Sequence, residues 1–339
     1  MEKIKKLLIL FGFAIFAIVI VAVGYKYLSM NATHELISVT VSPKWVNQAQ
    51  FAGIFVAQDK GMYANNGLNV IVKEFSFNEL PLESLLKGAS DFVYMSSQEY
   101  LKAYSDSKPI IAVAAFYQIS PFLVASLASK QITSPSGLKG KVLGIKGGPG
   151  AEGESIYDIL LNAAGLSLKD VTTKYIPFGT SELQDLQSDK ADAIGFYRTD
   201  QLYEFKQEGI EYSSIYPEQY ATGIYNDVLV VTKKFVNEHP DRVRAFIVGT
   251  QEGWAYAFDH RSEAIKIVLP YVTNSVYKDP VKERFILDQS EALMRPTPQT
   301  IVGSMDTLHW QRLYGILQSR KYLSRSFDIN DAFTTNYLK

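Results

Sequence analysis

Hydrophobic positions along this chain fall into short runs that alternate with amphipathic segments. The short runs are rich in β-branched and aromatic residues and have the length of strands. They are Leu36–Ser42, Leu68–Glu74, Asp91–Met95, Ile110–Phe116, Phe122–Leu127, Lys141–Ile145, Thr172–Ile176, Asp192–Phe196 and Val228–Thr232. The segments between them place apolar residues at helical spacing: Gln48–Asn65, Pro81–Lys87, Gln98–Ser105, Glu152–Ala164, Ser181–Ser188 and Thr199–Glu208. This alternation predicts an α/β fold of mainly parallel sheets with helices on both faces.

Two short segments between strand runs predict that the chain crosses between two lobes. The first is Gln118–Pro121 and the second is Tyr220–Asp227. Lobe 1 then comprises residues 36–118 plus 226–339, and lobe 2 comprises residues 119–225. From Pro240 onward the pattern is almost entirely helical. Ligands of open parallel sheets bind outside the carboxyl ends of the strands, so we expect the site in the loops that follow the predicted strands.

Residues 1–28 combine a basic flank with an apolar segment. Leu7–Gly24 runs 18 residues without a charge, after Lys3, Lys5 and Lys6. A helix that rises about 1.5 Å per residue spans roughly 27 Å over this segment, close to the thickness of a bilayer core. The basic flank predicts that the rest of the chain is exported. Two interpretations remain open: an uncleaved transmembrane anchor, and a signal peptide cleaved near Ala22–Gly24.

Charge and cysteine usage narrow the class of protein. A formal net charge of −1 over 339 residues argues against nucleic acid as a partner, because phosphates call for a basic face. The chain has no cysteine, which excludes thiol catalysis, thiolate metal sites, disulfides and an acylated lipoprotein anchor. No metal cluster or pair of nucleophile and base is evident, so we predict no metal, no cofactor and no enzymatic activity.

Several motifs occur in an order that resembles a known family. Lys44–Ala57 reads KWVNQAQFAGIFVA, and it is followed by KGMY at 60–63 and GLNV at 67–70. GKVLG at 140–144, ADA at 191–193, YNDV at 225–228, PDRVRAF at 240–246 and GWAYA at 253–257 continue the series. Over about residues 38–268 the chain resembles the thiamine-pyrimidine-precursor and sulfonate-type substrate-binding proteins of ABC transporters.

The resemblance implies a type II periplasmic-binding fold, in which two lobes close on a ligand that is passed to an ABC importer. Ligands in that family include pyrimidines, alkylsulfonates, nitrate and flavin-like rings. One eukaryotic branch instead synthesises the thiamine pyrimidine with a lysine-bound pyridoxal phosphate, iron and a cysteine-rich motif. The lack of cysteine places that chemistry in doubt for this chain.

Polar and aromatic residues after the strands of lobe 1 are the first candidates for ligand contact. They are Trp45, Asn47, Gln50, Ser96, Ser97 and Tyr117. Trp45 suits stacking on a planar ring, and Gln50 suits a hydrogen bond to the edge of that ring. Each has a structural alternative: a packing aromatic for Trp45, and helix caps for Asn47 and Ser97.

The second set of candidates comes from lobe 2 and from the return crossing. They are Gly147, Gly148, Gly150, Glu154, Tyr197, Tyr225 and Asp227. The glycine loop before a helix suits an anion, but Glu152 and Glu154 in the first turn oppose one. We therefore expect a neutral or amine-bearing ligand, with Asp227 accepting a hydrogen bond from an amino group. A tight turn is the alternative for the glycine loop, and a turn or hinge role is the alternative for Asp227.

Together these features predict an extracytoplasmic solute-binding protein that captures a small planar heterocycle, similar to a thiamine pyrimidine precursor, for an ABC importer. The expected partners are the ligand, the transporter permease and the cytoplasmic membrane through residues 7–24. Two alternatives stay open. One is a ligand sensor that signals through a membrane partner, and the other is a pyrimidine-synthesising enzyme.

Overall fold

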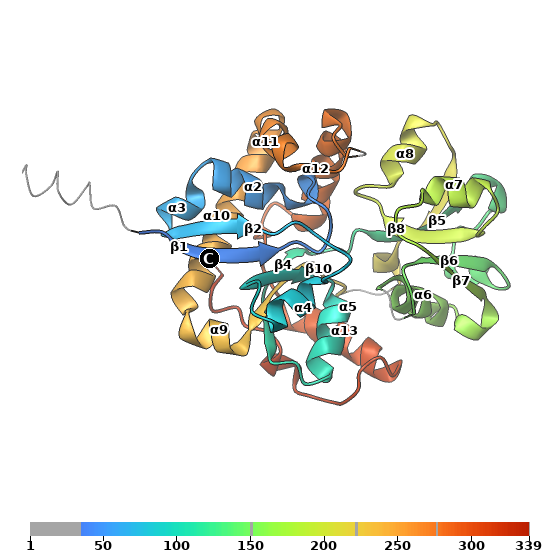
Figure 1. The fold of residues 1–339 in the computed structure, drawn as a ribbon. Helices are drawn as coiled ribbons and strands as arrows, with labels where there is room; N and C mark the ends of the chain where they lie inside the picture. The colour runs from blue at the N-terminus through green and yellow to red at the C-terminus, as the bar shows by residue number, and fades with distance from the viewer. Residues whose placement is uncertain (1–34, 150–151, 221–222, 276, 339) are drawn as a thin grey trace, which may run out of the picture. The chain divides into compact units, whose positions relative to one another are not determined.

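The computed structural model describes residues 35–149, 152–220, 223–275 and 277–338 (Figure 1). Within that range, Ser38–Lys339 belongs to one compact unit. The apolar segment Leu7–Gly24 lies outside the described residues. Among the helices that are described, none is long and apolar enough to cross a membrane.

Two five-stranded sheets form the framework of this unit. The first has the order β2 (Leu68–Val72), β1 (Ile37–Ser42), β3 (Phe92–Met95), β10 (Asn226–Thr232) and β4 (Ile110–Tyr117). The second has the order β7 (Thr172–Ile176), β6 (Val142–Lys146), β8 (Ala193–Tyr197), β5 (Phe122–Leu127) and β9 (Tyr212–Ile215). We call the bodies built around these sheets lobe 1 and lobe 2 (Figure 1).

The sheets are mainly parallel, as expected, but each contains one reversed strand: β10 among β1, β3 and β4, and β5 among β6, β7, β8 and β9. β1 pairs with β3 and β6 pairs with β7 and β8 in parallel. β10 runs antiparallel to β3 and β4, and β5 runs antiparallel to β8 and β9. β5 and β10 are the strands that the chain enters directly after passing from the other sheet. They run against their neighbours, whereas the parallel neighbours β6 and β7 are joined through a helix, α6.

Twelve α-helices are described around the sheets. They are α2 (Ala52–Asp59), α3 (Met62–Asn65), α4 (Pro81–Leu86), α5 (Ser97–Ser105), α6 (Glu152–Ala163), α7 (Glu182–Gln187), α8 (Leu202–Gln207), α9 (Lys233–Glu238), α10 (Pro240–Asp259), α11 (Arg261–Val268), α12 (Pro280–Met294) and α13 (Thr307–Ser319). The helix predicted over 48–65 is divided into a 3₁₀ turn, η1 (Ala49–Phe51), and α2 and α3. Gly61 separates α2 from α3 with a φ of +69°, a conformation that glycine adopts without strain.

The core of lobe 1 depends on a close approach between α2 and α10. A Cβ added to Gly253 would lie 2.0 Å from the carbonyl oxygen of Gly53. A Cβ added to Gly53 would lie 2.4 Å from the Trp254 ring. The two glycines therefore let one helix backbone pack directly on the other, and Trp254 fills the space beside them at 2% exposure.

We predict that Gly253→Ala lowers the free energy of unfolding by about 1–3 kcal/mol, because the new methyl group meets backbone that cannot move aside. The matched control is Gly315→Ala in α13, where an added Cβ meets nothing within 4 Å. That change should stabilise the protein by about 0.5–1 kcal/mol through helix propensity. Denaturant unfolding of both variants measures the difference, and an unchanged midpoint for Gly253→Ala would contradict the close approach.

Candidate functional site

Strand ends from both sheets meet where the chain crosses between lobes. In lobe 1, β10 begins beside the end of β4, with Asn226 opposite Tyr117. In lobe 2, β5 begins beside the end of β8, with Phe122 opposite Tyr197. The antiparallel strands thus bring their first residues to the same edge as the carboxyl ends of the parallel strands. This edge carries the polar side chains described next.

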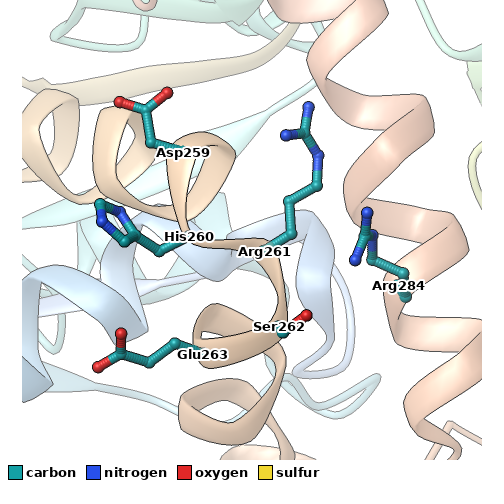
Figure 2. Close-up of a pocket in the computed structure, with 6 residues that line it drawn as sticks. All are labelled: Asp259, His260, Arg261, Ser262, Glu263 and Arg284. Carbon is teal, nitrogen blue, oxygen red and sulfur yellow. The ribbon is translucent and has the colours of Figure 1, made fainter.

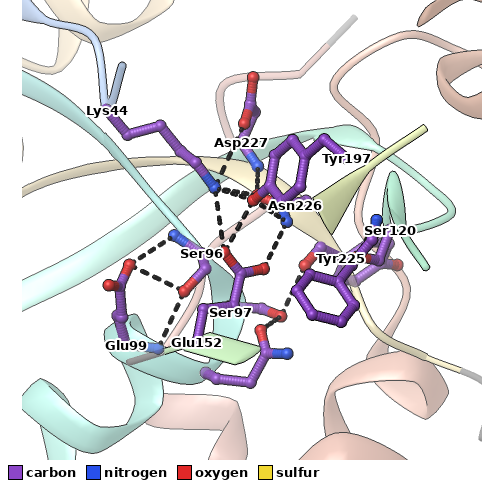
Figure 3. A network of polar contacts seen from close by, with 12 residues as sticks. Lys44, Ser96, Ser97, Glu99, Ser120, Glu152, Tyr197, Tyr225, Asn226 and Asp227 are labelled. Carbon is purple, nitrogen blue, oxygen red and sulfur yellow. Dashed lines mark hydrogen bonds and ion pairs between the residues drawn. The ribbon is translucent and has the colours of Figure 1, made fainter. Parts of the chain in front are cut away.

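Lys44, two residues after β1, lies at the centre of a buried polar network (Figure 3). Its ammonium donates to the Tyr197 hydroxyl at 2.6 Å and to the Asn226 side-chain oxygen. It lies 3.7 Å from a carboxylate oxygen of Glu152 and 3.7 Å from one of Asp227. A single cation from lobe 1 therefore contacts groups of lobe 2 and of the returning strand. We call Lys44, Gln50, Glu152, Tyr197, Asn226 and Asp227 the polar network.

Tyr197 and Asn226 complete the contacts around Glu152. The Tyr197 hydroxyl donates to Glu152 Oε2 at 2.7 Å and accepts from Asn226 Nδ2 at 2.8 Å. Asn226 Nδ2 also lies 2.8 Å from Glu152 Oε1, to which it donates. The hydroxyl accepts from Lys44 as well, so its one donor and two acceptor positions are all used. The network is therefore held in one arrangement by groups from both lobes.

Asp227 is the most constrained member of the network. Its φ of +47° lies in the left-handed region, which Asn and Asp tolerate better than other non-glycine residues. Gln50 Nε2 donates to both carboxylate oxygens, at 3.0 and 2.9 Å, and the side chain is 1% exposed. The Asp227 backbone N–H donates to Asn226 Oδ1 at 2.8 Å. The fold thus holds an uncommon backbone conformation at the start of β10, and this conformation aims a carboxylate at Lys44.

Burial dominates the electrostatics of the two carboxyl groups. It raises the pKa of Asp227 to about 6, against the lowering effect of Lys44 and Gln50. It also raises the pKa of Glu152, which Lys44 opposes and Glu99 reinforces. One ammonium therefore faces two carboxyl groups and a side-chain carbonyl. Such a set accepts hydrogen bonds and disfavours an anion.

Four aromatic rings form a second group at this edge. Trp45 follows β1, Phe75 and Phe77 follow β2, and Phe178 follows β7. The Trp45 ring centroid lies 5.4 Å from that of Phe75, 5.8 Å from that of Phe77 and 5.5 Å from that of Phe178. Phe77 and Phe178 stack at 5.3 Å. We call these four residues the aromatic cluster, which contains rings from both lobes.

Some of the residues proposed from sequence are in these two groups. Gln50, Tyr197 and Asp227 belong to the polar network, and Trp45 belongs to the aromatic cluster. Asn47 is 8% exposed, and its side-chain oxygen has no hydrogen-bond partner within the described residues. It caps no helix that the structure describes, since Gln48 precedes η1. Asn47 therefore stays a candidate for ligand contact.

Four other candidates have structural partners that account for them. Ser96 caps α5 in a capping box with Glu99, and Ser97 donates to the Tyr225 carbonyl at 2.6 Å (Figure 3). The Tyr117 hydroxyl lies 2.7 Å from Ser290 in the lobe 1 core rather than at the cleft. Tyr225 is fully buried, and its hydroxyl accepts from the backbone N–H of Asp306 at 2.8 Å. Hydroxyls after a strand suit a ligand and a helix cap equally, and the cap is what the structure shows.

The glycine loop contributes less than expected. Gly147 has a φ of +91° and its N–H donates to Ile176 of β7, so it makes the turn. Gly148 is exposed, and Gly150 lies outside the described residues. Glu154 accepts from Tyr175 of the same lobe at 3.3 Å. The acid of this helix that joins the polar network is Glu152, two residues earlier.

Lys44, Glu152 and Asn226 are network residues that sequence reasoning did not select. Each lies next to or near a selected residue: Lys44 before Trp45, and Asn226 before Asp227. Their side-chain directions depend on the turn after β1 and on the left-handed residue at 227, which the hydrophobic pattern does not reveal. The sequence did contain one indication of Lys44: it is a charged residue that lies two positions after a predicted strand.

A surface hollow elsewhere on lobe 1 is lined by residues of the α10–α11 turn and by Arg284 of α12 (Figure 2). Arg261 pairs with Asp288 and Glu291, and Arg284 pairs with Asp288. These charges are neutralised within the lobe and involve no residue of lobe 2. Among the described residues, no group of three or more His, Asp or Glu side chains is placed to hold a metal ion. The polar network and the aromatic cluster are therefore the candidate site.

Two lobes, each with a mixed five-stranded sheet, and a polar site at the crossings between them define the periplasmic-binding fold. The alkanesulfonate-binding protein SsuA from Escherichia coli superposes with a TM-score of 0.70 at 13% identity. The match covers 89% of this chain and 99% of that one. The family model described as NMT1/THI5 like matches residues 48–264, so the chain belongs to that family.

Curated relatives match over most of their length. The riboflavin-binding protein RibY of Chloroflexus aurantiacus is 26% identical over 91% of this chain and 88% of its own. The formylaminopyrimidine-binding protein of Halalkalibacterium halodurans is 24% identical over 88% and 90%. A Legionella pneumophila relative named 4-amino-5-hydroxymethyl-2-methylpyrimidine phosphate synthase is 21% identical over 88% and 92%. Two of these three relatives are therefore named as binding proteins, and the third is named as an enzyme.

The raised pKa of Asp227 predicts a pH dependence of stability. The native state holds this proton more tightly than the unfolded chain does, so stability falls as the pH rises from about 4 to about 6. The difference between 3.8 and about 6 corresponds to about 3 kcal/mol. Asp227→Asn keeps the left-handed backbone accessible and removes this loss, which unfolding measurements between pH 4 and pH 7 will show.

The control for this prediction is Asp170→Asn. Hydrogen bonds from Ser167 lower the pKa of that carboxyl group, the opposite direction to the shift at Asp227. Its replacement should leave the slope between pH 4 and pH 6 as in the wild type. Equal slopes for Asp227→Asn and the wild type would show that Asp227 titrates normally.

Proposed function

We propose that this chain captures a small planar heterocycle bearing hydrogen-bond donors, of the thiamine pyrimidine precursor type, outside the cytoplasm and delivers it to an ABC importer. The observation that carries this proposal is the polar network. Its acceptors come from lobe 2 and from the start of strand β10 in lobe 1, and they converge on one ammonium group. A ligand held there touches both lobes at once.

The chemistry of the site supports a donor-bearing heterocycle over an anion. Glu152, Asp227 and the Asn226 carbonyl accept hydrogen bonds, as the edge of an aminopyrimidine requires. An alkylsulfonate or nitrate would instead meet two carboxyl groups and only one ammonium. Trp45 beside Lys44 offers a ring for stacking. The names of the riboflavin-binding and formylaminopyrimidine-binding relatives point to the same class of planar, nitrogen-rich ligands.

Capture by closure needs no reactive group. Lys44 and Gln50 belong to lobe 1, and Glu152 and Tyr197 belong to lobe 2. A ligand that satisfies both sets stabilises the arrangement in which the lobes approach each other. The pyrimidine-synthesising branch of the family uses a cysteine-rich motif, and this chain has no cysteine. The sensor alternative needs a signalling partner that the chain does not specify. Neither alternative is favoured by the site.

The N-terminal segment completes the proposal. Leu7–Gly24 would anchor the binding module to the cytoplasmic membrane and keep it near a permease. Because the chain has no cysteine to acylate, this apolar segment is the tether that the sequence offers.

Thermal unfolding with added ligands tests the proposed function. A 4-aminopyrimidine should raise the Tm, since a ligand present at 100 Kd stabilises the native state by about 2.7 kcal/mol. Methanesulfonate and nitrate should not. Asp227→Asn should weaken aminopyrimidine binding by roughly 10- to 100-fold, the loss expected for a hydrogen bond to a charged group. Trp45→Ala should abolish the shift in Tm.

Tyr212→Ala is the matched control for these variants. It removes an exposed aromatic side chain from β9, the strand at the far edge of the lobe 2 sheet from β7. Its Tm shift should equal that of the wild type. A shift with sulfonate but none with aminopyrimidines would contradict the proposed ligand class, and an unchanged shift in Trp45→Ala would remove Trp45 from the site.

Expression of the full chain in bacteria tests the anchor. Intact-mass measurement of the protein in the membrane fraction should give a species that retains residues 1–28, and carbonate washing should leave it in the membrane. Replacement of Ile15 and Ile18 by Lys should release the protein, because each charge at the centre of a span costs about 3 kcal/mol. A soluble periplasmic species that begins after Ala22–Gly24 would instead establish cleavage.

A further inference from the structure

Helix α8 of lobe 2 and helix α12 of lobe 1 contribute to a contact between the lobes that involves no residue of the polar network (Figure 1). The residues that make this contact are spaced three positions apart on each side, and residues at that spacing share one face of a helix. They are Asp200 and Tyr203 from lobe 2, and Asp279, Lys282 and Phe285 from lobe 1. We call these five residues the α8–α12 clasp.

The clasp combines three kinds of interaction. Lys282 Nζ lies 3.0 Å from Asp200 Oδ1, and the two side chains are 6% and 4% exposed. The Tyr203 hydroxyl donates to Asp279 Oδ2 at 2.9 Å. The centroid of the Phe285 ring lies 5.7 Å from that of Tyr203, and Phe285 packs against the hydrophobic core of lobe 2. A buried ion pair, a hydrogen bond and an aromatic contact therefore join the lobes here.

The clasp residues of lobe 1 lie at the start of α12. Asp279 is the N-cap of this helix, and Lys282 and Phe285 belong to its first two turns. The ends of a helix lack part of their intrahelical hydrogen bonds and open more easily than its middle. Farther along, Ile286 and Leu287 are packed in the core of lobe 1. Contacts with lobe 2 thus hold the part of α12 that its own lobe holds least.

Glu283, the residue after Lys282, contacts lobe 1 instead of lobe 2. Neighbouring positions of a helix do not share a face. The Glu283 side chain is fully buried, and its Oε2 accepts a hydrogen bond from the backbone N–H of Ala49. Ala49 precedes Gln50 of the polar network, and both belong to the segment 44–50, which we call the site turn. The first turn of α12 therefore contacts lobe 2 through one residue and the site turn through the next.

We propose that Lys282 and Glu283 are positioning residues for the candidate site: the α8–α12 clasp fixes the first turn of α12, and Glu283 in that turn fixes the site turn. The clasp forms when the lobes are together, so the site turn is held in place in step with closure. Ligand affinity then depends on a contact that the ligand does not touch. The inference goes beyond the proposed function, because it applies to any ligand that contacts the site turn.

Hydrogen exchange of the full-length protein in detergent, without ligand, tests the link from the clasp to the site turn. Lys282→Met and Phe285→Ala remove clasp contacts and leave the site turn unaltered in sequence. Each should speed the exchange of backbone amides in peptides that cover residues 44–51 by about fivefold or more, because the hydrogen bond to Ala49 is no longer held in place. Mass spectrometry of the digested protein measures these rates.

Two replacements of Glu283 test its role by loss and by rescue. Glu283→Leu removes the acceptor and should speed exchange of the site turn as the clasp variants do. Glu283→Gln keeps an oxygen that accepts from Ala49. Burial raises the pKa of Glu283 to about 8, so the wild-type group is mostly protonated at neutral pH and the neutral amide resembles it. Glu283→Gln should therefore exchange at close to the wild-type rate.

The distance between the lobes is a second measurement that needs no ligand. Because the chain has no cysteine, Lys169→Cys in lobe 2 and Asn237→Cys in lobe 1, both at exposed positions, give a unique pair of spin labels. In this background Lys282→Met and Phe285→Ala should add a population with a longer distance between the labels. They should also weaken binding of 4-amino-2-methylpyrimidine about tenfold, since less of the protein is in the closed state.

Val281→Ala is the matched control. Val281 lies in the same turn of α12, next to Lys282, and is 61% exposed. Its replacement should change neither the exchange of the site turn nor the distance between the lobes. Faster exchange in this variant too would show that general fraying of α12, and not the clasp, controls the site turn, which would overturn the inference.

The remaining outcomes separate this inference from the proposed function. Unchanged exchange of the site turn in both Lys282→Met and Phe285→Ala would overturn the inference. Longer distances between the lobes with unchanged exchange would do the same, because the clasp would then join the lobes without positioning the site. If 4-amino-2-methylpyrimidine does not bind the wild type while exchange responds as expected, the inference holds and the proposed ligand class is contradicted.

Discussion

Lys44 carries the interaction on which the arrangement of the site depends. Two carboxyl groups, Glu152 and Asp227, are taken out of water beside each other, and burial opposes their ionisation. The Lys44 ammonium, 3.7 Å from both, is the cation that compensates them. Because Glu152 belongs to lobe 2 and Asp227 to the returning strand, this compensation is available only where the two sheet edges meet. The direction of β10 is consistent with that requirement. β10 must begin, not end, at this edge to present Asn226 and Asp227 there, and it therefore runs antiparallel to β3 and β4.

Backbone conformation at the crossing and hydrogen bonding in the site are linked through Asp227. Its left-handed φ sits where the chain re-enters lobe 1, and Gln50 and Lys44 hold its side chain. A change in the hydrogen bonds of this carboxylate therefore acts on the backbone conformation of the segment that joins the lobes. In many two-lobed proteins a few residues at the ends of strands absorb the change in backbone angles on closure. The residue in that position here is also an acid of the polar network.

The sequence pattern predicted most of the framework and selected some residues of the candidate site. Runs of β-branched and aromatic residues located nine of the ten strands that the structure describes to within a few residues, since most of these strands carry a continuous apolar signal. β9 was missed because Tyr212–Ile215 is a short, half-exposed edge strand with two serines. The reversed directions of β5 and β10 were not predicted, because periodicity carries no information on strand direction. Ser96, Ser97, Tyr117 and Tyr225 share the residue types of a site, but their partners are a helix cap, a carbonyl, Ser290 and Asp306. Only three-dimensional placement separates such residues from Gln50 or Asp227.

Contacts between the lobes outside the site set how much of the ligand's binding energy appears as affinity. Arg320, just after α13, donates to Asp158 of α6 at 2.7 Å and to Asn162 at 3.0 Å. Lys282 of α12 pairs with Asp200 at 3.0 Å, and Tyr203 of α8 donates to Asp279 at 2.9 Å. These contacts join lobe 1 to lobe 2 and involve no residue of the polar network. They lower the free energy of the arrangement with the lobes together, and the ligand then supplies only the remaining difference between open and closed states. Ion pairs and hydrogen bonds away from the polar network therefore contribute to holding the lobes together, and the affinity for a ligand that bridges the lobes depends on them as well as on the groups that the ligand contacts.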